Sequence, residues 1–248
     1  MSYFEGFIAP VPDVNRDAYL KHSAGLAPLL QECGVGRMVE SWEDQIPDGE
    51  LTDFRKAVDA KPNEKVVFSW FEYPGKAERD ASSEKFMSDP RLKDMGANVP
   101  FDARRMIFGG FEAIVDEGAA GGGRYTDGFV VPVQHSKRDE YQALASQMAE
   151  QFREYGATRV VEAFSNDVPR GEVTDFYRAV KAEDGEGVVF SFIEWPDKQT
   201  RDQAWGKIMA GERHRPLPFD GKRMFWGGFK KILDTAKPQL AQQATLPA

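Results

Sequence analysis

The sequence predicts an α+β fold in which two tandem duplicated ferredoxin-like units pack sheet to sheet as an intrachain pseudo-dimeric α/β barrel. Two observations lead to this prediction. The 248-residue chain contains the same pattern twice, and each copy has the order β-α-β-β-β-α-β, with strands that are apolar on both faces.

The duplication is visible as blocks that recur at a constant offset. The offset is 122 residues as far as Met87 and Met209, and a four-residue deletion then reduces it to 118. The matching blocks are 6–11 with 128–133, 37–40 with 159–162, 52–58 with 174–180, 66–72 with 188–194 and 100–111 with 218–229. We therefore divide the chain into repeat 1 (1–117), a Gly-rich linker (118–124), repeat 2 (125–236) and a flexible tail (237–248).

The first half of each copy begins with a strand and a helix. Residues 3–11 alternate in polarity and are rich in aromatic residues, which predicts a strand. Residues 15–33 predict a helix that ends at Gly34. The equivalent helix of the second copy shows the apolar spacing most clearly, at Tyr141, Leu144, Ala145, Met148, Ala149 and Phe152.

The rest of each copy predicts three strands, a second helix and a last strand. The three strands are expected at 37–44, 51–58 and 65–73, with a turn at Pro47-Asp48-Gly49. Pro74 precedes the helix expected at 76–88, and the last strand, 104–115, contains the Gly109-Gly110 pair.

The strand 65–73 shows why the two units must pack together. Phe68 and Trp70 point to one face, whereas Val67 and Phe71 point to the other, so both faces are apolar. A sheet of this kind must be buried on both sides. The helices cover one face, and we expect the second copy to cover the other.

Charge and composition exclude several classes of partner. The net charge is −8 and the pI is about 5.1, so we expect no binding to nucleic acid or to anionic lipid. No apolar window is long enough for a membrane span, and the start of the chain does not resemble a secretory signal. With one cysteine, Cys33, and three non-repeating histidines, we expect a cytoplasmic protein with no metal site and no cofactor.

Four blocks carry a family resemblance: GFIAPVP, RMVESWEDQIPDGELTDFRKAV, VVFSWFEYP and FDARRMIFGGFE. They resemble the YbaA-like family of bacterial domains of unknown function, over nearly the whole chain and in two copies. The resemblance implies a dimeric α/β-barrel (ferredoxin-like) fold and no established activity. The wider superfamily includes cofactor-free monooxygenases, haem-degrading enzymes and small stress-response barrels, and fold alone does not choose among them.

Glu40 and Glu162 are the candidate catalytic residues. They share a strand face with apolar residues, and a carboxylate in such surroundings has a raised pKa and is suited to general acid–base work. The alternative is an ion pair with an arginine such as Arg37 or Arg105, or a solvated position at the sheet edge.

Further residues are candidates for ligand binding because they recur in both copies. Arg105 and Arg223 match the geometry of a ligand carboxylate, or else pair with a carboxylate of the protein itself. Glu72 and Glu194 stand at a strand end, where exposure is the plainer interpretation. The remaining candidates are aromatic, and they line a ligand pocket or simply fill the core: Trp42, Phe164, Trp70 and Phe192.

Two hypotheses of function follow. The first is a barrel that binds an aromatic or apolar metabolite in a cavity between the two sheets, with Glu40 and Glu162 at its mouth and with cofactor-independent chemistry such as mono-oxygenation or isomerisation. The second is a non-enzymatic interaction or stress-response module, in which duplication makes a dimer permanent. A small-molecule ligand and self-association of the fused pair are the partners that the sequence leaves open.

Overall fold

The computed structural model describes residues 2–92, 99–211 and 216–236. The first half contains β1 (Tyr3–Pro12), α1 (Arg16–Cys33), β2 (Arg37–Gln45), α2 (Phe54–Ala57), β3 (Glu64–Tyr73), α3 (Lys76–Ser88) and β4 (Ile107–Gly118). The second half repeats this order with β5 (Tyr125–Gln134), α5 (Arg138–Glu154), β6 (Arg159–Asp167), α6 (Phe176–Ala179), β7 (Glu186–Trp195), α7 (Lys198–Gly211) and β8 (Phe225–Asp234).

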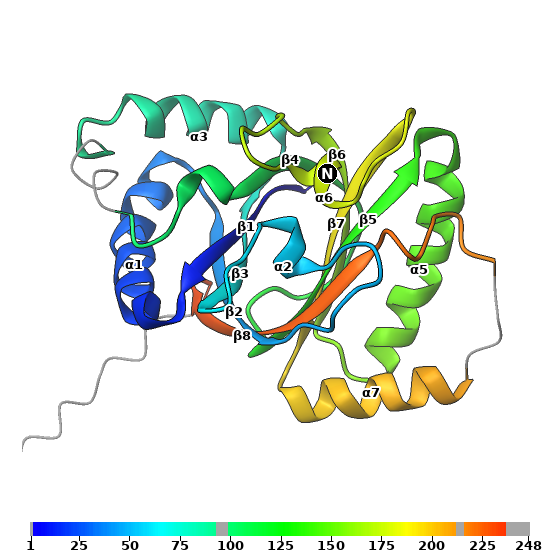
Figure 1. Ribbon diagram of the computed structural model, residues 1–248. Helices are drawn as coiled ribbons and strands as arrows, with labels where there is room; N and C mark the ends of the chain where they lie inside the picture. Colours follow the sequence, from blue (N-terminus) through cyan, green and yellow to red (C-terminus); the bar gives the residue numbers. More distant parts are fainter. Residues whose placement is uncertain (1, 93–98, 212–215, 237–248) are drawn as a thin grey trace, which may run out of the picture.

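The described strands form one closed antiparallel barrel in the order β1-β3-β2-β8-β5-β7-β6-β4 (Figure 1). The two halves join along two seams, where β2 pairs with β8 and β4 pairs with β6. Opposite positions at these seams include Trp42 with Lys230 and Ala113 with Ala163. The predicted α+β barrel built from two repeated units is therefore confirmed, and backbone hydrogen bonds as well as side chains hold the units together.

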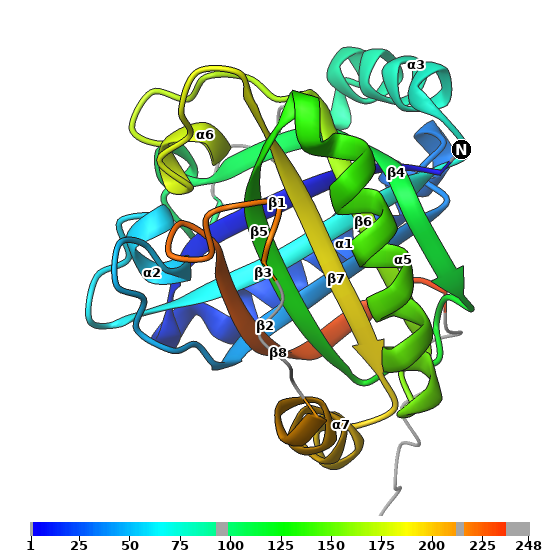
Figure 2. The same ribbon diagram turned by 90° about the vertical axis from the view of Figure 1, so that its right-hand side faces the viewer.

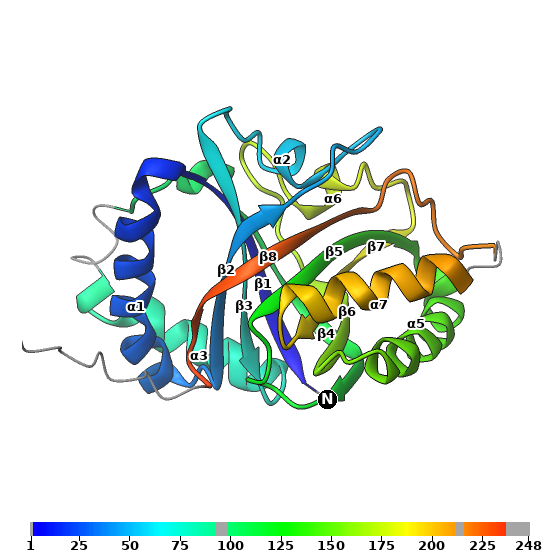
Figure 3. The same cartoon turned by 90° about the horizontal axis from the view of Figure 1, so that it is seen from below.

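The long helices lie outside the barrel in two groups. Helices α1 and α3 cover the side formed by the first half, and α5 and α7 cover the opposite side (Figure 3). Each group packs on its own apolar cluster: Tyr19 of α1 lies against Trp42, whereas Phe152 of α5 lies against Trp195. Every strand therefore has one face toward helices and one toward the barrel interior.

The strand predicted at 51–58 is wrong, because the segment contains the one-turn helix α2. The Asp53 carboxylate accepts a hydrogen bond from the Lys56 backbone N–H at 2.8 Å, which caps this turn, and Phe54 is fully buried. Helices α2 and α6 lie side by side at one end of the barrel (Figure 2). There Thr52 Oγ1 donates to the carbonyl of Ala179 at 2.6 Å, so each unit helps to close the other.

Aromatic side chains fill the space between the two sheets. Phe68 and Phe190 stack with their ring centroids 4.6 Å apart, and Trp70 and Phe192 stack at 4.0 Å. Gly6 is required here, because a Cβ at this position would lie 2.7 Å from the Phe190 ring. The predicted ligand cavity between the sheets is therefore wrong: this space is the hydrophobic core of the protein.

The linker between the halves is anchored at both ends. The Ala119 N–H donates to the carbonyl of Thr158 at 3.0 Å, and the Arg124 N–H donates to the carbonyl of Trp195 at 2.8 Å. The predicted flexible tail, 237–248, lies outside the described residues. Among the helices of the described part, none has the length and apolar character that a membrane span requires.

Candidate active site

Glu40 and Glu162 lie on the helix-facing side of the barrel wall, not at the mouth of an inter-sheet cavity. Glu40 is opposite Ser69 in the β2–β3 register, whereas its neighbour Val39 belongs to the interior core. Glu162 on β6 is opposite Ser191 on β7 in the same way. Each carboxylate therefore occupies the layer between the sheet and the first long helix of its own unit.

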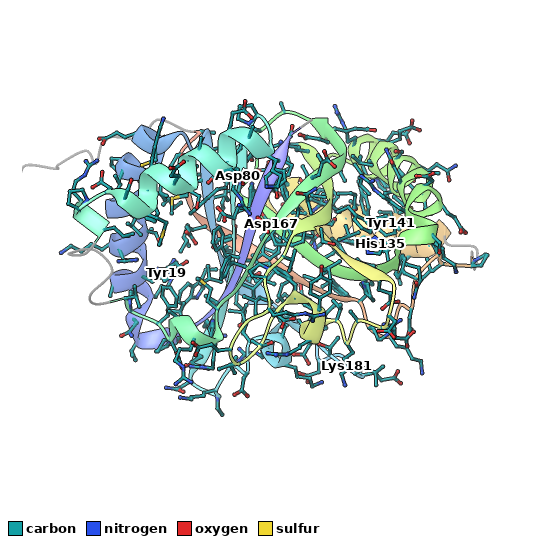
Figure 4. The ribbon with its side chains drawn as sticks, turned by 90° about the horizontal axis from the view of Figure 1, so that it is seen from above. Tyr19, Asp80, His135, Tyr141, Asp167 and Lys181 are labelled. Carbon is teal, nitrogen blue, oxygen red and sulfur yellow. The ribbon has the colours of Figure 1, made fainter. Side chains whose placement is uncertain are left out.

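The same hydroxyl groups surround the two carboxylates. Tyr19 of α1 donates a hydrogen bond to Glu40 Oε2 at 2.6 Å, and Ser69 of β3 donates to the same oxygen. In the second half, Tyr141 of α5 donates to Glu162 Oε2 at 2.7 Å. The two tyrosines come from opposite sides of the barrel (Figure 4), so the molecule carries two separate copies of this arrangement.

Within the described part of the chain, no lysine, arginine or histidine lies within ion-pair distance of either carboxylate. Other buried carboxylates do have a cation: Glu64 pairs with Arg105 at 2.7 Å, and Asp127 pairs with Arg201 at 2.8 Å. The alternative of an ion pair between Glu40 and Arg37 or Arg105 is therefore wrong. Glu40 is 4% exposed, so its charge has neither a cation nor much water to stabilise it.

Burial sets the proton affinity of both carboxyl groups. Desolvation raises the pKa of Glu40 from 4.5 to about 7, although the hydrogen bonds from Ser69 and Tyr19 act in the opposite direction. The pKa of Glu162 is raised to about 7 for the same reason, against the hydrogen bonds from Tyr141 and Ser191. At neutral pH each carboxyl is thus able both to accept and to release a proton.

Tyr19 and Tyr141 stay protonated near neutral pH and so remain hydrogen-bond donors to the carboxyl groups. Desolvation and the neighbouring carboxylate raise the pKa of Tyr19 and of Tyr141 well above 10. The arrangement therefore has one titrating group per site, oriented by fixed hydroxyl donors. In residues 2–92, 99–211 and 216–236, no three His, Cys, Asp or Glu side chains are grouped as metal ligands.

The walls of both sites are aromatic. Tyr19 packs against Trp42 at 6.3 Å and against Phe101 at 5.8 Å, measured between ring centroids. Tyr141 packs against Phe219 at 5.7 Å, and Phe164 lies in the same cluster. Trp42 and Phe164 thus lie in the same layer as the carboxylates.

The other aromatic candidates are not near the carboxylates. Trp70 and Phe192 stack in the barrel interior, on the opposite side of the sheet, and are fully buried. A surface groove of about 280 Å³ is lined by 47–50, 52–53, 221–222 and 224–226, and none of the candidate residues lines it.

Glu72 and Glu194 are not exposed but belong to a network of charges at one end of the barrel. Arg37 contacts Glu194 at 2.6 Å and Glu72 at 2.9 Å, and Arg159 contacts Glu72 at 2.9 Å. Lys231 also donates to Glu194. The prediction that these carboxylates are exposed is wrong, because arginines of both halves contact them.

Arg105 and Arg223 are both occupied by carboxylates of the protein. Arg105 donates two hydrogen bonds of 2.7 Å to Glu64 and a third, of 2.9 Å, to Asp102. Arg223 makes the same bidentate contact with Glu186, at 2.6 and 2.9 Å. These contacts use the donors that a ligand carboxylate would need, so the structure supports the structural alternative for both arginines.

The sequence interpretation overlooked Tyr19, Tyr141 and the two serines as partners of the carboxylates. The sequence does contain a pattern that predicts the tyrosines as partners: a tyrosine recurs at the same place on the apolar stripe of the first helix in both copies, 122 residues apart. A buried hydroxyl needs a hydrogen-bond partner, and the repeated glutamate of the next strand supplies it.

The family model for DUF1428, described as a protein of unknown function, matches residues 2–103 and 124–221. The chain belongs to this family. Each matched segment corresponds to one of the two units, so this family member carries the domain twice. A relative, the uncharacterised protein YbaA of Escherichia coli strain K12, is 55% identical over 117 residues, which are 47% of this chain and 100% of the relative.

Solved structures with the same architecture support the fold. A Fusobacterium nucleatum protein provisionally designated a monooxygenase superimposes with a TM-score of 0.59 at 9% identity, over 94% of this chain and 93% of that chain. A Lactobacillus acidophilus protein of the same provisional designation gives a TM-score of 0.55 at 9% identity, over 94% and 95% of the chains. At this level of identity the likeness extends to the fold alone.

Proposed function

We propose that this DUF1428 protein is an enzyme that transfers protons to and from a small apolar or aromatic molecule with a buried glutamate, without a bound cofactor. The observation that carries the proposal is the carboxylate at each site: Glu40 is buried and Glu162 partly buried, both have hydroxyl partners and no cation among the described residues, and both have a pKa near 7. A carboxylate that only served stability would be paired, as Glu64 and Glu186 are.

The chemistry begins with a C–H or O–H bond of raised acidity. The glutamate takes the proton, and the electron pair of the broken bond remains on the substrate as an enolate or phenolate. Return of the proton to a different carbon is an isomerisation. Reaction of the anion of a methylene group with dioxygen, to give a carbonyl group and water, is a mono-oxygenation. The designation of the two structural neighbours is a reason to test the second outcome.

The test uses 2-tetralone, an aromatic ketone with an acidic methylene group, as a probe. Deuterium incorporation from D2O is followed by NMR and oxygen consumption by electrode, for the wild type, Glu40→Gln, Glu162→Gln and the double variant. We expect the double variant to lose about 100-fold or more of the catalysed exchange, the usual contribution of a general base. Glu140→Gln, which changes an exposed carboxylate of α5, is the matched control.

Two outcomes would contradict the proposal. One is a wild-type protein that accelerates neither exchange nor oxygen consumption. The other is a double variant as active as the wild type. Either result would favour the interaction or stress-response module, whose expected signature is a protein partner and no stabilisation by small molecules.

A further inference from the structure

The two glutamate sites differ in their access to solvent. Glu40 is 4% exposed, whereas Glu162 is only partly buried. The aromatic walls differ too: Trp42 packs on the ring of Tyr19, at 6.3 Å between centroids, and is an indole where the second half has the smaller Phe164. The carboxylate of the first half is therefore the more deeply buried of the two, in a wall with the larger aromatic side chain.

Phe164 packs closely on the neighbouring strand. A Cβ at Gly187 would be 2.5 Å from Cε1 of its ring, and the first half has Lys65 at the equivalent place. The same ring lies 5.5 Å from the ring of His135 and 5.3 Å from the guanidinium carbon of Arg138. The Phe164 ring thus lies between the start of α5 and the layer that holds Glu162; in the first half Arg16 lies over Trp42 in the same way, at 5.7 Å.

The segment that precedes the first long helix differs in charge between the halves. His135-Ser136-Lys137-Arg138 stands where the first half has Asp13-Val14-Asn15-Arg16, so an aspartate and an asparagine have become a histidine and a lysine. In the first half, Asn15 Nδ2 donates to the carbonyl of Pro100 at 2.9 Å, which ties the segment before Phe101 to the helix. The corresponding segment of the second half is four residues shorter.

Arg138 has donors that the protein does not use fully. Its Nε is buried and has no hydrogen-bond partner among the described residues, and its ion pair with Glu112 is long, at 3.8 Å from Nη2. The side chain is 42% exposed, so it is reachable from solvent. Asp139 and Glu140 follow in the first turn of α5 but are themselves exposed to water, which screens their charges.

We infer that the substrate enters only the Glu162 site, and that it is a small aromatic molecule with an anionic group that Arg138 binds. This inference rests on the proposed function, because it assigns a substrate class to one of the two proposed sites. Arg138 holds the anionic group at the rim, Phe164 lies against the aromatic ring, and Glu162 meets the reacting end. The Glu40 site, whose carboxylate is 4% exposed, is closed to the substrate.

Binding of 2-naphthoate, with neutral 2-naphthalenemethanol as its partner probe, tests the inference in the full-length protein by calorimetry. We expect one naphthoate site per chain. Arg138→Gln should weaken naphthoate binding about 10-fold or more and leave binding of the alcohol unchanged, whereas the matched variant Arg16→Gln should change neither. Phe164→Trp should abolish binding of both probes, whereas Trp42→Phe should not.

The outcomes separate this inference from the proposed function. If Glu162→Gln retains naphthoate binding and no variant affects deuterium exchange into 2-tetralone, the result supports the substrate site and contradicts the proton-transfer function. If exchange depends equally on Glu40 and Glu162, or Arg16→Gln weakens binding as much as Arg138→Gln, the restriction to one site is overturned. Absence of naphthoate binding, or two equal sites per chain, also overturns it. Circular dichroism of each variant verifies its fold.

Discussion

Phe68 and Phe190 are equivalent residues of the two repeats, and they stack on each other with centroids 4.6 Å apart and ring planes 7° apart. This contact reflects the duplication directly: Phe68 comes from β3 of the first unit and Phe190 from the equivalent strand β7 of the second. Both residues are fully buried. The interior of the barrel is therefore where the two units recognise each other.

Phe68→Ala should lower the free energy of unfolding by about 3–5 kcal/mol, because it leaves a cavity at this contact that the closed barrel has little freedom to collapse. The measurement is urea unfolding followed by circular dichroism. Phe108→Ala is the control, since Phe108 is 42% exposed, and it should cost less than about 1 kcal/mol. Equal costs for the two variants would contradict the packed interior.

Glu40→Gln should change how stability depends on pH. The pKa of Glu40 is raised to about 7 in the folded protein from 4.5, so the folded state binds its proton more tightly than the unfolded chain does. The stability that the protonated group contributes is complete below pH 4.5 and is lost as the pH rises to 7. Glutamine stays neutral at every pH, so the variant does not lose this stability. Its free energy of unfolding should rise relative to that of the wild type between pH 4.5 and pH 7, and the difference should reach about 3 kcal/mol above pH 7.

Chemical unfolding of both proteins at pH 5, 6, 7 and 8 measures this difference. Glu140→Gln, which changes an exposed carboxylate, should follow the wild type at every pH. If the free energies of unfolding of Glu40→Gln and the wild type differ by the same amount at every pH, the raised pKa is wrong. The carboxylate would then be stabilised in the folded protein by interactions other than those of Tyr19 and Ser69.

The barrel was predictable because duplication and two-faced strands leave few ways to bury the sheets. The prediction from the sequence was wrong where a single polar capping residue, and not the apolar residues around it, determines the local structure. Residues 51–58 contain enough apolar residues for a strand, but Asp53 caps a helical turn that carries Phe54 into the barrel end. One capping residue decided that segment, and periodicity over eight residues does not detect it.

The candidate site was predictable only in part, for a geometric reason. Strand alternation identified Glu40 and Glu162 as carboxylates on an apolar face. It did not say whether that face meets helices or the other sheet, and the inter-sheet choice was wrong. The partner hydroxyls of Tyr19 and Ser69 come from elements 21 and 29 residues away, a proximity that the order of elements alone does not reveal.

Arg105→Gln and Arg223→Gln should each destabilise the protein by about 3 kcal/mol at pH 7, because each leaves a buried glutamate without its cation. The guanidinium of Arg105 lowers the pKa of Glu64 below 4.5, so this stabilisation exists above the unfolded pKa and is lost as the pH falls. The variants should therefore lose less stability than the wild type between pH 6 and pH 3.

Arg104→Gln is the control for these two variants, since Arg104 is 74% exposed and its neighbour Glu172 is 77% exposed. It should change stability by less than about 0.5 kcal/mol. A large effect of Arg105→Gln on binding of 2-naphthoate, with unchanged stability, would restore the ligand-clamp interpretation that the contacts with Glu64 and Asp102 oppose.

The charge network at the barrel end should show strong coupling between Arg37 and Lys231. Both contact the fully buried Glu194, and both contact Asp234, at 2.8 and 3.2 Å. After Arg37→Gln, Lys231 still neutralises these carboxylates, so the single variant should cost only about 1–2 kcal/mol.

Removal of both cations leaves Glu194 with Arg159 at 3.9 Å as its remaining ion pair among the described residues. Arg37→Gln combined with Lys231→Ala should therefore cost more than the sum of the single variants, by about 2–3 kcal/mol in a double-mutant cycle measured by urea unfolding. Ala113 stands at the position of Lys231 in the first half, so the extra cation belongs to one half only. Additive costs would mean that Arg159 moves in to replace both cations.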